Sequence, residues 1–168
     1  MANWLQFNKI ELWDSVGITG FQYNEVSDAE IQAALYSPHL PHINTALDWE
    51  DDDWLADHMT ITPNKKHAYR VAALVADLRA GLGLATAIEL DTFSAMRCCS
   101  CVPNGHHRIR ALQFLGVPCG PFSLAGNLKE LSALVRLAQL PCPPEFTHFF
   151  RSALLLKNNQ DVRVRQKR

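Results

Sequence analysis

The segment VPNGHHRIRALQFLG, residues 102–116, constrains the fold of this chain more than any other stretch. Residues 103–105, Pro-Asn-Gly, are a strong turn signal because proline fixes its own backbone and glycine adopts conformations that other residues avoid. Gly116 is a typical helix stop. Between turn and stop, apolar side chains recur at helical spacing, at Ile109, Leu112 and Leu115. The segment therefore predicts a tight turn that leads directly into a short helix.

Similar patterns predict the remaining elements. Helical periodicity indicates helices over residues 68–79 and 127–138, and a further helix from residue 145 onward. Ser27 followed by Glu30 predicts a capping box at the start of a short helix that ends before Pro38. Runs rich in β-branched and aromatic residues indicate strands at residues 9–13, 17–23, 86–94 and 96–102. We therefore expect an α+β fold in which a small mixed sheet is flanked by helices.

Size and composition suit one domain. The chain has 168 residues, of which 48% are hydrophobic, enough for a proper core. No apolar run approaches the roughly 20 residues that a membrane-spanning helix needs. The N-terminal residues lack the pattern of an export signal, so we expect a cytoplasmic protein, and the family resemblance given below implies a bacterial one. Five cysteines in such a chain are expected to be free thiols.

Charge is distributed unevenly along the sequence. Residues 1–58 contain eleven acids and one base, whereas the remainder contains fifteen bases and six acids. This asymmetry predicts an anion-binding or nucleic-acid-facing C-terminal part. It is equally compatible with two halves that neutralise each other across a packed interface. The acidic residues 48–57 are expected to form a solvated loop or a surface for a basic partner.

The turn at residues 103–105 has the composition of an anion site. Backbone N–H groups and the helix dipole favour an anion at the start of a helix. Arg108 in the first turn opposes the dipole unless a bound anion compensates for both, and a guanidinium holds phosphate oxygens in a bidentate fork. His106 and His107 could donate hydrogen bonds or exchange protons near neutral pH. The alternative is structural, with His107 half-buried and satisfied and Arg110 a surface charge.

The same segment resembles the signature of the ParB/sulfiredoxin superfamily, whose members hold nucleotide phosphates at a Gly-x-His-Arg or Gly-Glu-Arg-Arg-x-Arg-Ala turn. Gly105, His107 and Arg108 match the first form, and Gly105, Arg108, Arg110 and Ala111 match the second. Upstream, YRVAALVADL resembles the first helix of the superfamily and AIEL resembles its following strand. The resemblance covers about residues 63–122.

The resemblance implies a nucleotide site with ATP as the cofactor. It implies phosphate binding by Arg70, Asn104, Gly105, His106, Arg108 and Arg110, and catalysis by Glu89, His107 and Arg108. Glu89 and Asp91 are two residues apart on the expected strand, so they share a face and could hold Mg²⁺. Asp91 as a simple turn cap is the alternative. His106 stands where sulfiredoxins carry a cysteine nucleophile, so their thiol–phosphoryl chemistry is not expected here.

The function that follows is a nucleotide-dependent phosphoryl-bond hydrolase. The group of similar small modules includes plasmid-encoded fertility-inhibition proteins of the Osa type, which implies ATPase and DNase activity and inhibition of conjugative or type IV secretion DNA transfer. The expected partners are a nucleotide, DNA and a protein component of such an apparatus. Alternatives are a non-catalytic adaptor that binds a basic partner through residues 48–57, a CTP-dependent DNA clamp and a small-molecule kinase.

The domain organisation expected on this basis has three parts. Residues 1–60 form an acidic extension packed on the core, residues 61–158 form the ParB/sulfiredoxin-like domain with its C-terminal helices, and residues 159–168 form a basic tail. That tail is expected either to contact DNA backbone or to be solvated. Cys98, Cys99 and Cys101 lack the paired spacing of a structural zinc site, so buried free thiols are expected there instead.

Overall fold

A computed structural model of the chain describes residues 4–7, 26–38, 40, 63–91, 105–125 and 142–151. Its elements, in chain order, are β1 (Trp4–Gln6), α1 (Asp28–Leu35), α3 (Pro63–Arg79), β2 (Ile88–Asp91), α5 (His106–Phe114), β3 (Cys119–Ala125) and the 3₁₀ helix η4 (Pro144–Phe149). The strands predicted at residues 9–13, 17–23 and 96–102 lie outside these residues. So do the helix predicted at 127–138, the acidic residues 48–57 and the basic tail.

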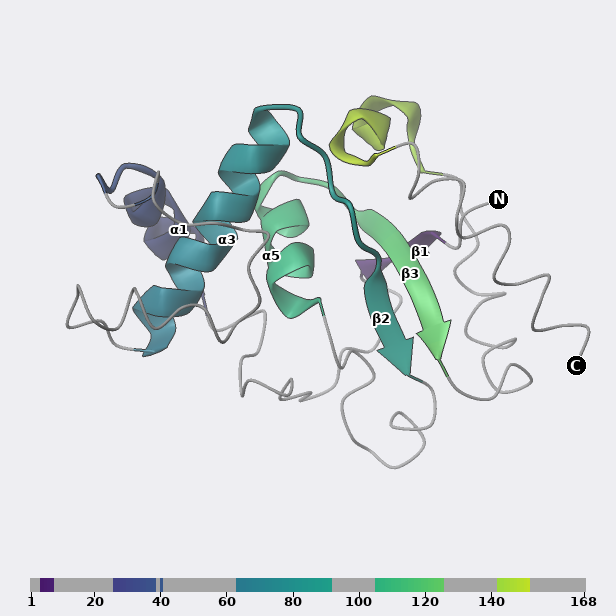
Figure 1. Cartoon of the computed structure of the whole chain (residues 1–168), viewed down its shortest axis with the longest axis horizontal. Coiled ribbons are helices and arrows are strands. Elements are labelled where there is room, and N and C mark those ends of the chain that lie inside the picture. The colour runs from purple at the N-terminus through teal and green to yellow at the C-terminus, as the bar shows by residue number, and fades with distance from the viewer. Residues whose placement is uncertain are drawn as a thin grey trace, which may run out of the picture.

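The three described strands form one mixed sheet in the order β1-β3-β2 (Figure 1). β3 pairs in parallel with β2, with Ile88 opposite Phe122, and antiparallel with β1, with Leu5 opposite Gly120. The parallel strands β2 and β3 are connected through α5, because parallel neighbours require a crossover. The expected α+β class with a small mixed sheet is therefore confirmed in the described part of the chain.

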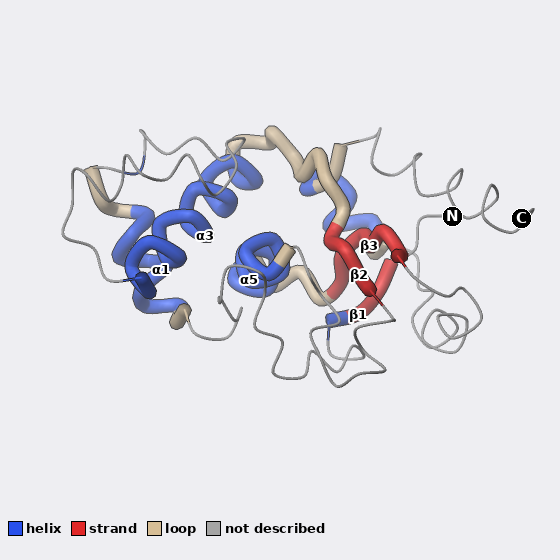
Figure 2. The backbone as a smooth tube through the Cα atoms, turned by 60° about the horizontal axis from the view of Figure 1, so that its bottom comes forward, coloured by secondary structure: helices blue, strands red, loops and turns tan. Residues whose placement is uncertain are grey.

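The α-helices lie to one side of the strands, with α5 between α3 and the sheet (Figures 1 and 2). α1 packs on α3, α3 packs on α5, and α5 contacts both β2 and β3. β1 and α1 come from the predicted N-terminal extension, yet Phe7, Val26 and Ile31 from that part are buried in the same core as the rest. The described residues of this part thus contribute to the core of the domain.

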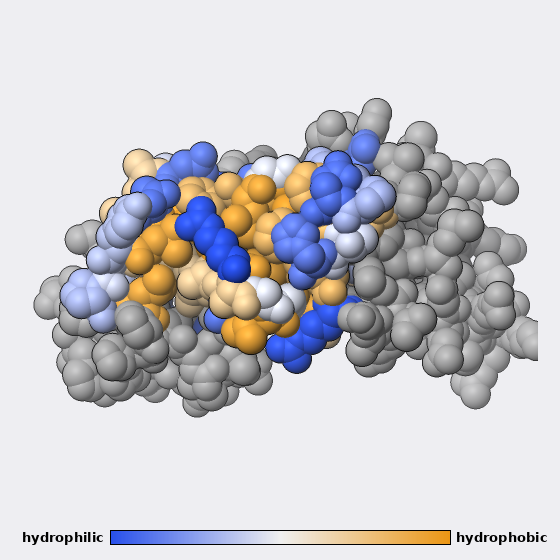
Figure 3. Space-filling model, turned by 90° about the horizontal axis from the view of Figure 1, so that it is seen from above, coloured by the Kyte–Doolittle hydropathy of each residue, from blue (hydrophilic) through white to orange (hydrophobic). Residues whose placement is uncertain are grey.

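The core runs between the helices and the sheet. Its largest fully buried side chains are Phe122, Ile31, Leu78, Ile88, Ile109, Leu112, Val26, Val71 and Val75. Seen from above, apolar residues gather across the middle of the described surface, and hydrophilic residues lie both across them and toward the sides (Figure 3). None of the described helices is both long and apolar enough to cross a membrane.

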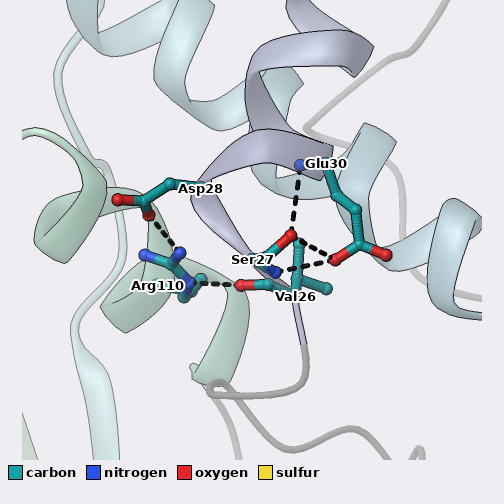
Figure 4. Close-up of polar contacts among 5 residues, drawn as sticks. All are labelled: Val26, Ser27, Asp28, Glu30 and Arg110. Carbon is teal, nitrogen blue, oxygen red and sulfur yellow. Dashed lines mark hydrogen bonds and ion pairs between the residues drawn. The ribbon is translucent and has the colours of Figure 1, made fainter.

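α1 begins as the capping box predicts. The Ser27 hydroxyl accepts from the backbone N–H of Glu30 at 3.3 Å, and the Glu30 carboxylate accepts from the backbone N–H of Ser27 at 2.8 Å (Figure 4). The hydrogen bonds from Ser27 lower the pKa of Glu30. The prediction of a short helix that ends before Pro38 is confirmed, since α1 ends at Leu35.

α3 is longer than predicted. The apolar periodicity indicates a helix from residue 68, but the helix begins at Pro63, five residues earlier. Proline suits the first position of a helix because its missing N–H is not needed there. The early turns include Lys66 and His67, whose polar character hides the helical pattern.

The helix predicted from residue 145 is not continuous through Phe150 and Arg151, and its part after Arg151 lies outside the described residues. Pro144–Phe149 is a 3₁₀ helix, and Phe150 is extended, with φ −128° and ψ 136°. Phe150 forms an isolated parallel bridge with Leu84, in which the N–H of Leu84 donates to the carbonyl of Phe149 at 2.8 Å. Pairing with the segment before β2 thus overrides the local helical preference.

Gly105 is where α5 meets β2. Its φ of +123° is rarely adopted by residues with a side chain, and a Cβ added to it would lie 2.9 Å from Ile88 Cγ2 and 3.2 Å from Ile88 Cα. Ile88 is the first residue of β2 and is fully buried. The glycine therefore lets the start of α5 lie directly against the start of β2.

We predict that Gly105→Ala lowers the free energy of unfolding by about 3 kcal/mol, because backbone strain and overpacking add at this position. Gly116→Ala is the matched control, because Gly116 has a φ of +73° but nothing within 4 Å of an added Cβ. Its cost is expected to be about 1 kcal/mol, from strain alone. Urea unfolding measures both values, and equal costs would contradict the close contact with Ile88.

Candidate functional site

The first turn of α5 presents two histidines and an arginine. His106, His107 and Arg108 follow the cap residue Gly105, which offers no side-chain hydrogen bond, and no acidic residue lies in this turn. In any α-helix the first N–H groups point out of the N-terminus, where the dipole is positive. His106 is buried, whereas His107 and Arg108 are partly buried. This helix start therefore concentrates positive potential without an acidic cap.

His107 contacts a histidine of the neighbouring helix. The Nδ1 atom of His67, in α3, lies 2.9 Å from Nε2 of His107, and the two ring centroids are 5.2 Å apart with a 30° tilt. Arg70 lies one helical turn after His67, so both side chains can face the same neighbour. The packing of α3 on α5 thus brings His67, Arg70 and His107 into one cluster.

Both histidines of this contact resist protonation. Burial lowers the pKa of His67 to about 4, and the charges of Lys66 and Arg70 add to the effect. Burial also lowers the pKa of His107 well below 6.5, and positive charge at the surrounding residues His67, Arg70, His106 and Arg108 adds to it. Both rings are therefore neutral at pH 7, although each nitrogen keeps its capacity to donate or accept.

Arg108 points to the other side of the first turn. Its Nη1 donates a hydrogen bond to the carbonyl oxygen of Ala87, the residue before β2. Burial lowers the pKa of Arg108, the charge of Glu89 opposes this, and the charge of Arg70 adds to it. Arg108 thus holds α5 against the start of β2. Its charge and that of Arg70 both act on His107.

The predicted acids lie on β2. Glu89 is exposed and opposite Ser123, and Asp91 is opposite Ala125, with its side chain outside the described part. That the two acids share one face of the sheet stays a prediction from strand alternation. Among the described side chains, no group of three or more His, Cys, Asp or Glu could hold a metal ion. A Mg²⁺ site at Glu89 and Asp91 stays a prediction.

Arg110 lies apart from the cluster. Its Nε donates to the carbonyl oxygen of Val26 at 2.7 Å, and its Nη2 pairs with the carboxylate of Asp28 at the start of α1 (Figure 4). Its side chain is 11% exposed, so it is not the surface charge of the structural alternative. These contacts hold α1 against α5. Because they occupy the guanidinium of Arg110, we do not assign this residue to phosphate binding, in contrast to the prediction from sequence.

The structure thus brings together Arg70, His107 and Arg108 of the predicted site. Glu89 acts electrostatically on Arg108, and Gly105 and His106 belong to the same turn. Asn104 lies outside the described residues. Sequence reasoning missed His67, although its spacing of three residues from Arg70 would have indicated a shared face had the helix been extended back to Pro63.

Two of the five cysteines are described, and both are free thiols. Cys119 is buried at the start of β3, and Cys142 is partly buried before η4. Burial raises the pKa of Cys142 to about 12, with Cys119 adding to the effect, and burial also raises the pKa of Cys119. These thiols are therefore poor nucleophiles at neutral pH. Cys98, Cys99 and Cys101 lie outside the described residues.

Comparison of the chain with models of known protein families, with curated proteins and with solved structures found no match in any of the three. The assignment of a function therefore depends on the cluster itself.

We predict that the free energy of unfolding falls as the pH is lowered from 6.5 toward 4. In this window the unfolded chain binds protons on histidine while the folded pair, with its lowered pKa, does not. His67→Asn should flatten the profile, and His148→Asn, at an exposed histidine of η4, should leave it unchanged. Denaturant unfolding at several pH values measures this, and superimposable profiles for wild type and His67→Asn would contradict it.

We predict that Arg110→Met lowers the free energy of unfolding by about 2 kcal/mol, because it removes a charge-assisted hydrogen bond to the Val26 carbonyl. Asp28→Asn should cost less than about 1 kcal/mol, because the Asp28 side chain is 75% exposed and its ion pair is screened. Both variants should bind anions like the wild type. Equal costs for the two substitutions would contradict the larger role given to the carbonyl contact.

Proposed function

We propose that this chain binds nucleotide phosphates at the cluster between α3 and α5 and hydrolyses a phosphoryl bond there. The single observation that carries the proposal is the convergence of two arginines and two neutral histidines at the N-terminus of α5. Like charges placed together in a partly buried position repel one another, and a phosphate would relieve that repulsion. A cationic cluster that favours an anion is what phosphoryl transfer requires.

The roles follow from the surroundings of each group. Arg70 and Arg108 neutralise the phosphoryl oxygens, and Arg108 is held in place by the carbonyl of Ala87. His107 is neutral at pH 7, so it can accept a proton from an attacking water or donate a hydrogen bond to a phosphoryl oxygen. Glu89 lies on the strand beside Arg108 and is the candidate group to orient that water.

The order of elements adds support to the resemblance to the ParB/sulfiredoxin superfamily. A helix at Pro63–Arg79, a strand at Ile88–Asp91 and a glycine turn into the helix His106–Phe114 follow one another in the order that the resemblance implies. We therefore propose that the chain has a ParB/sulfiredoxin-like fold. The proposal also includes ATP as the nucleotide, with Mg²⁺ held by Glu89 and Asp91 to neutralise phosphoryl charge when bound.

DNA is the second proposed substrate. Hydrolysis of a phosphodiester bond also requires positive charge around the phosphate and an activated water. This extension rests on the resemblance, and so does the proposed interference with conjugative or type IV secretion DNA transfer. Nicking of a supercoiled plasmid by the purified chain, lost in the same variant that loses nucleotide hydrolysis, would support one site for both substrates.

We predict that Arg70→Ala lowers the rate of ATP hydrolysis at least about 100-fold, the loss expected when one charge-stabilising donor is removed. Arg79→Ala is the matched control, because it removes the same charge from the far end of the same helix, and it should keep full activity. Labelled ATP, CTP and a supercoiled plasmid are incubated with each protein, with and without Mg²⁺. Equal rates for the two variants would overturn the site, and binding of CTP without hydrolysis would favour a DNA clamp.

A further inference from the structure

We propose that His67 and His107 act as one proton-sharing pair, which takes up a proton when a phosphoryl dianion binds beside it. This rests on the proposed phosphate site and deepens it, because it gives a role to His67 in the binding step. The inference stands on the contact between α3 and α5, where Nδ1 of His67 and Nε2 of His107 are 2.9 Å apart.

The contact couples the protonation of the two rings. Two nitrogens at hydrogen-bond distance require one donor and one acceptor, so in the neutral pair a single proton lies between them. If His107 donates from Nε2, His67 accepts at Nδ1 and carries its own proton on Nε2. If His67 donates from Nδ1, His107 accepts at Nε2 and carries its proton on Nδ1. The tautomer of one ring therefore fixes that of the other.

The pair has room for one additional proton. An imidazolium beside an imidazole keeps the hydrogen bond, because one facing nitrogen still accepts. Two imidazolium rings would place protons on both facing nitrogens and break the contact. The pair is thus a unit that gains one proton and resists a second, and its titration belongs to both rings together.

Among the described residues, positive charges act on the pair from both of its own helices. These groups are Lys66 and Arg70 of α3, and His106 and Arg108 of α5. Three described acids of neighbouring elements have contacts with other groups. Glu89 of β2 acts on Arg108, and on α1, which also packs on α3, Asp28 pairs with Arg110 and Glu30 bonds to Ser27. Burial, and to a lesser degree these positive charges, keep the pair neutral.

A phosphoryl dianion bound beside these cations should raise the pKa of the pair. Its negative charge beside the rings favours their charged form, so an additional proton becomes more stable on the pair. Binding should then take up as much as about one proton per anion. By linkage, the affinity for the anion should rise by up to about tenfold for each unit by which the pH is lowered between 8 and 6.5. In this range a phosphate monoester is still mostly a dianion.

The experiment is calorimetric titration of the full chain with inorganic tripolyphosphate at pH 7, in two buffers with different heats of ionisation. The difference in heat gives the protons taken up, and the contribution of tripolyphosphate itself cancels when proteins are compared. His67→Asn is the informative variant, because its amide stands at the position of Nδ1 but does not titrate. The matched control is His148→Asn, at an exposed histidine of η4.

We expect wild type and His148→Asn to take up the same number of protons, and His67→Asn to bind tripolyphosphate with at least half of that uptake lost. Binding by His67→Asn with unchanged uptake would overturn the pair. A second measurement needs no variant. Long-range ¹H–¹⁵N spectra of the wild type should show a nitrogen of His67 or His107 shift toward its imidazolium value on saturation with tripolyphosphate, and neutral rings in the complex would overturn the pair as well.

The two proposals fail in different ways. If tripolyphosphate binds and wild type and His67→Asn take up the same number of protons, the phosphate site stands and the proton-sharing pair is overturned alone. If tripolyphosphate does not bind to the wild-type chain, the phosphate site fails and the pair is overturned with it.

Discussion

The contact between the start of α5 and the start of β2 determines where every candidate group of this protein lies. Gly105 brings the two backbones together at Ile88, at a distance that a Cβ would not permit. Arg108 then donates to the carbonyl of Ala87, which fixes the rotation of α5 about its axis. With that rotation set, His107 turns toward α3 and meets His67. The position of the charged cluster thus depends on the packing of Gly105 against Ile88.

The cluster that results is electrostatically costly to the folded chain. The charge of Arg70 acts on Arg108 and on both histidines, the charge of Arg108 acts on His107, and burial weakens the screening of these interactions. The two rings respond by staying neutral, with the pKa of His67 lowered to about 4. Ionisable groups whose pKa values are shifted by burial and by neighbouring charges are typical of functional sites. The apolar core on either side of α5 supplies the stability that this arrangement requires.

Much of the fold could be predicted from sequence because local signals and tertiary packing agree. The capping box at Ser27 and the glycine stop after α5 are such cases, and both are confirmed. β3 was not predicted, because Gly120 and Pro121 interrupt its apolar pattern, and only pairing on both sides makes it a strand. His67 was missed for a related reason, since polar residues conceal the first turns of α3. Strand pairing between distant segments and the contact between α3 and α5 cannot be predicted from local sequence patterns.

The most direct test of the cluster as a phosphate site is a crystal structure of the chain grown with a slowly hydrolysed ATP analogue. The account predicts the terminal phosphate within hydrogen-bond distance of the Arg70 guanidinium and of the first turn of α5, with His107 facing a phosphoryl oxygen. Phosphates bound elsewhere on the chain, with Arg70 paired to a carboxylate of the protein, would contradict it.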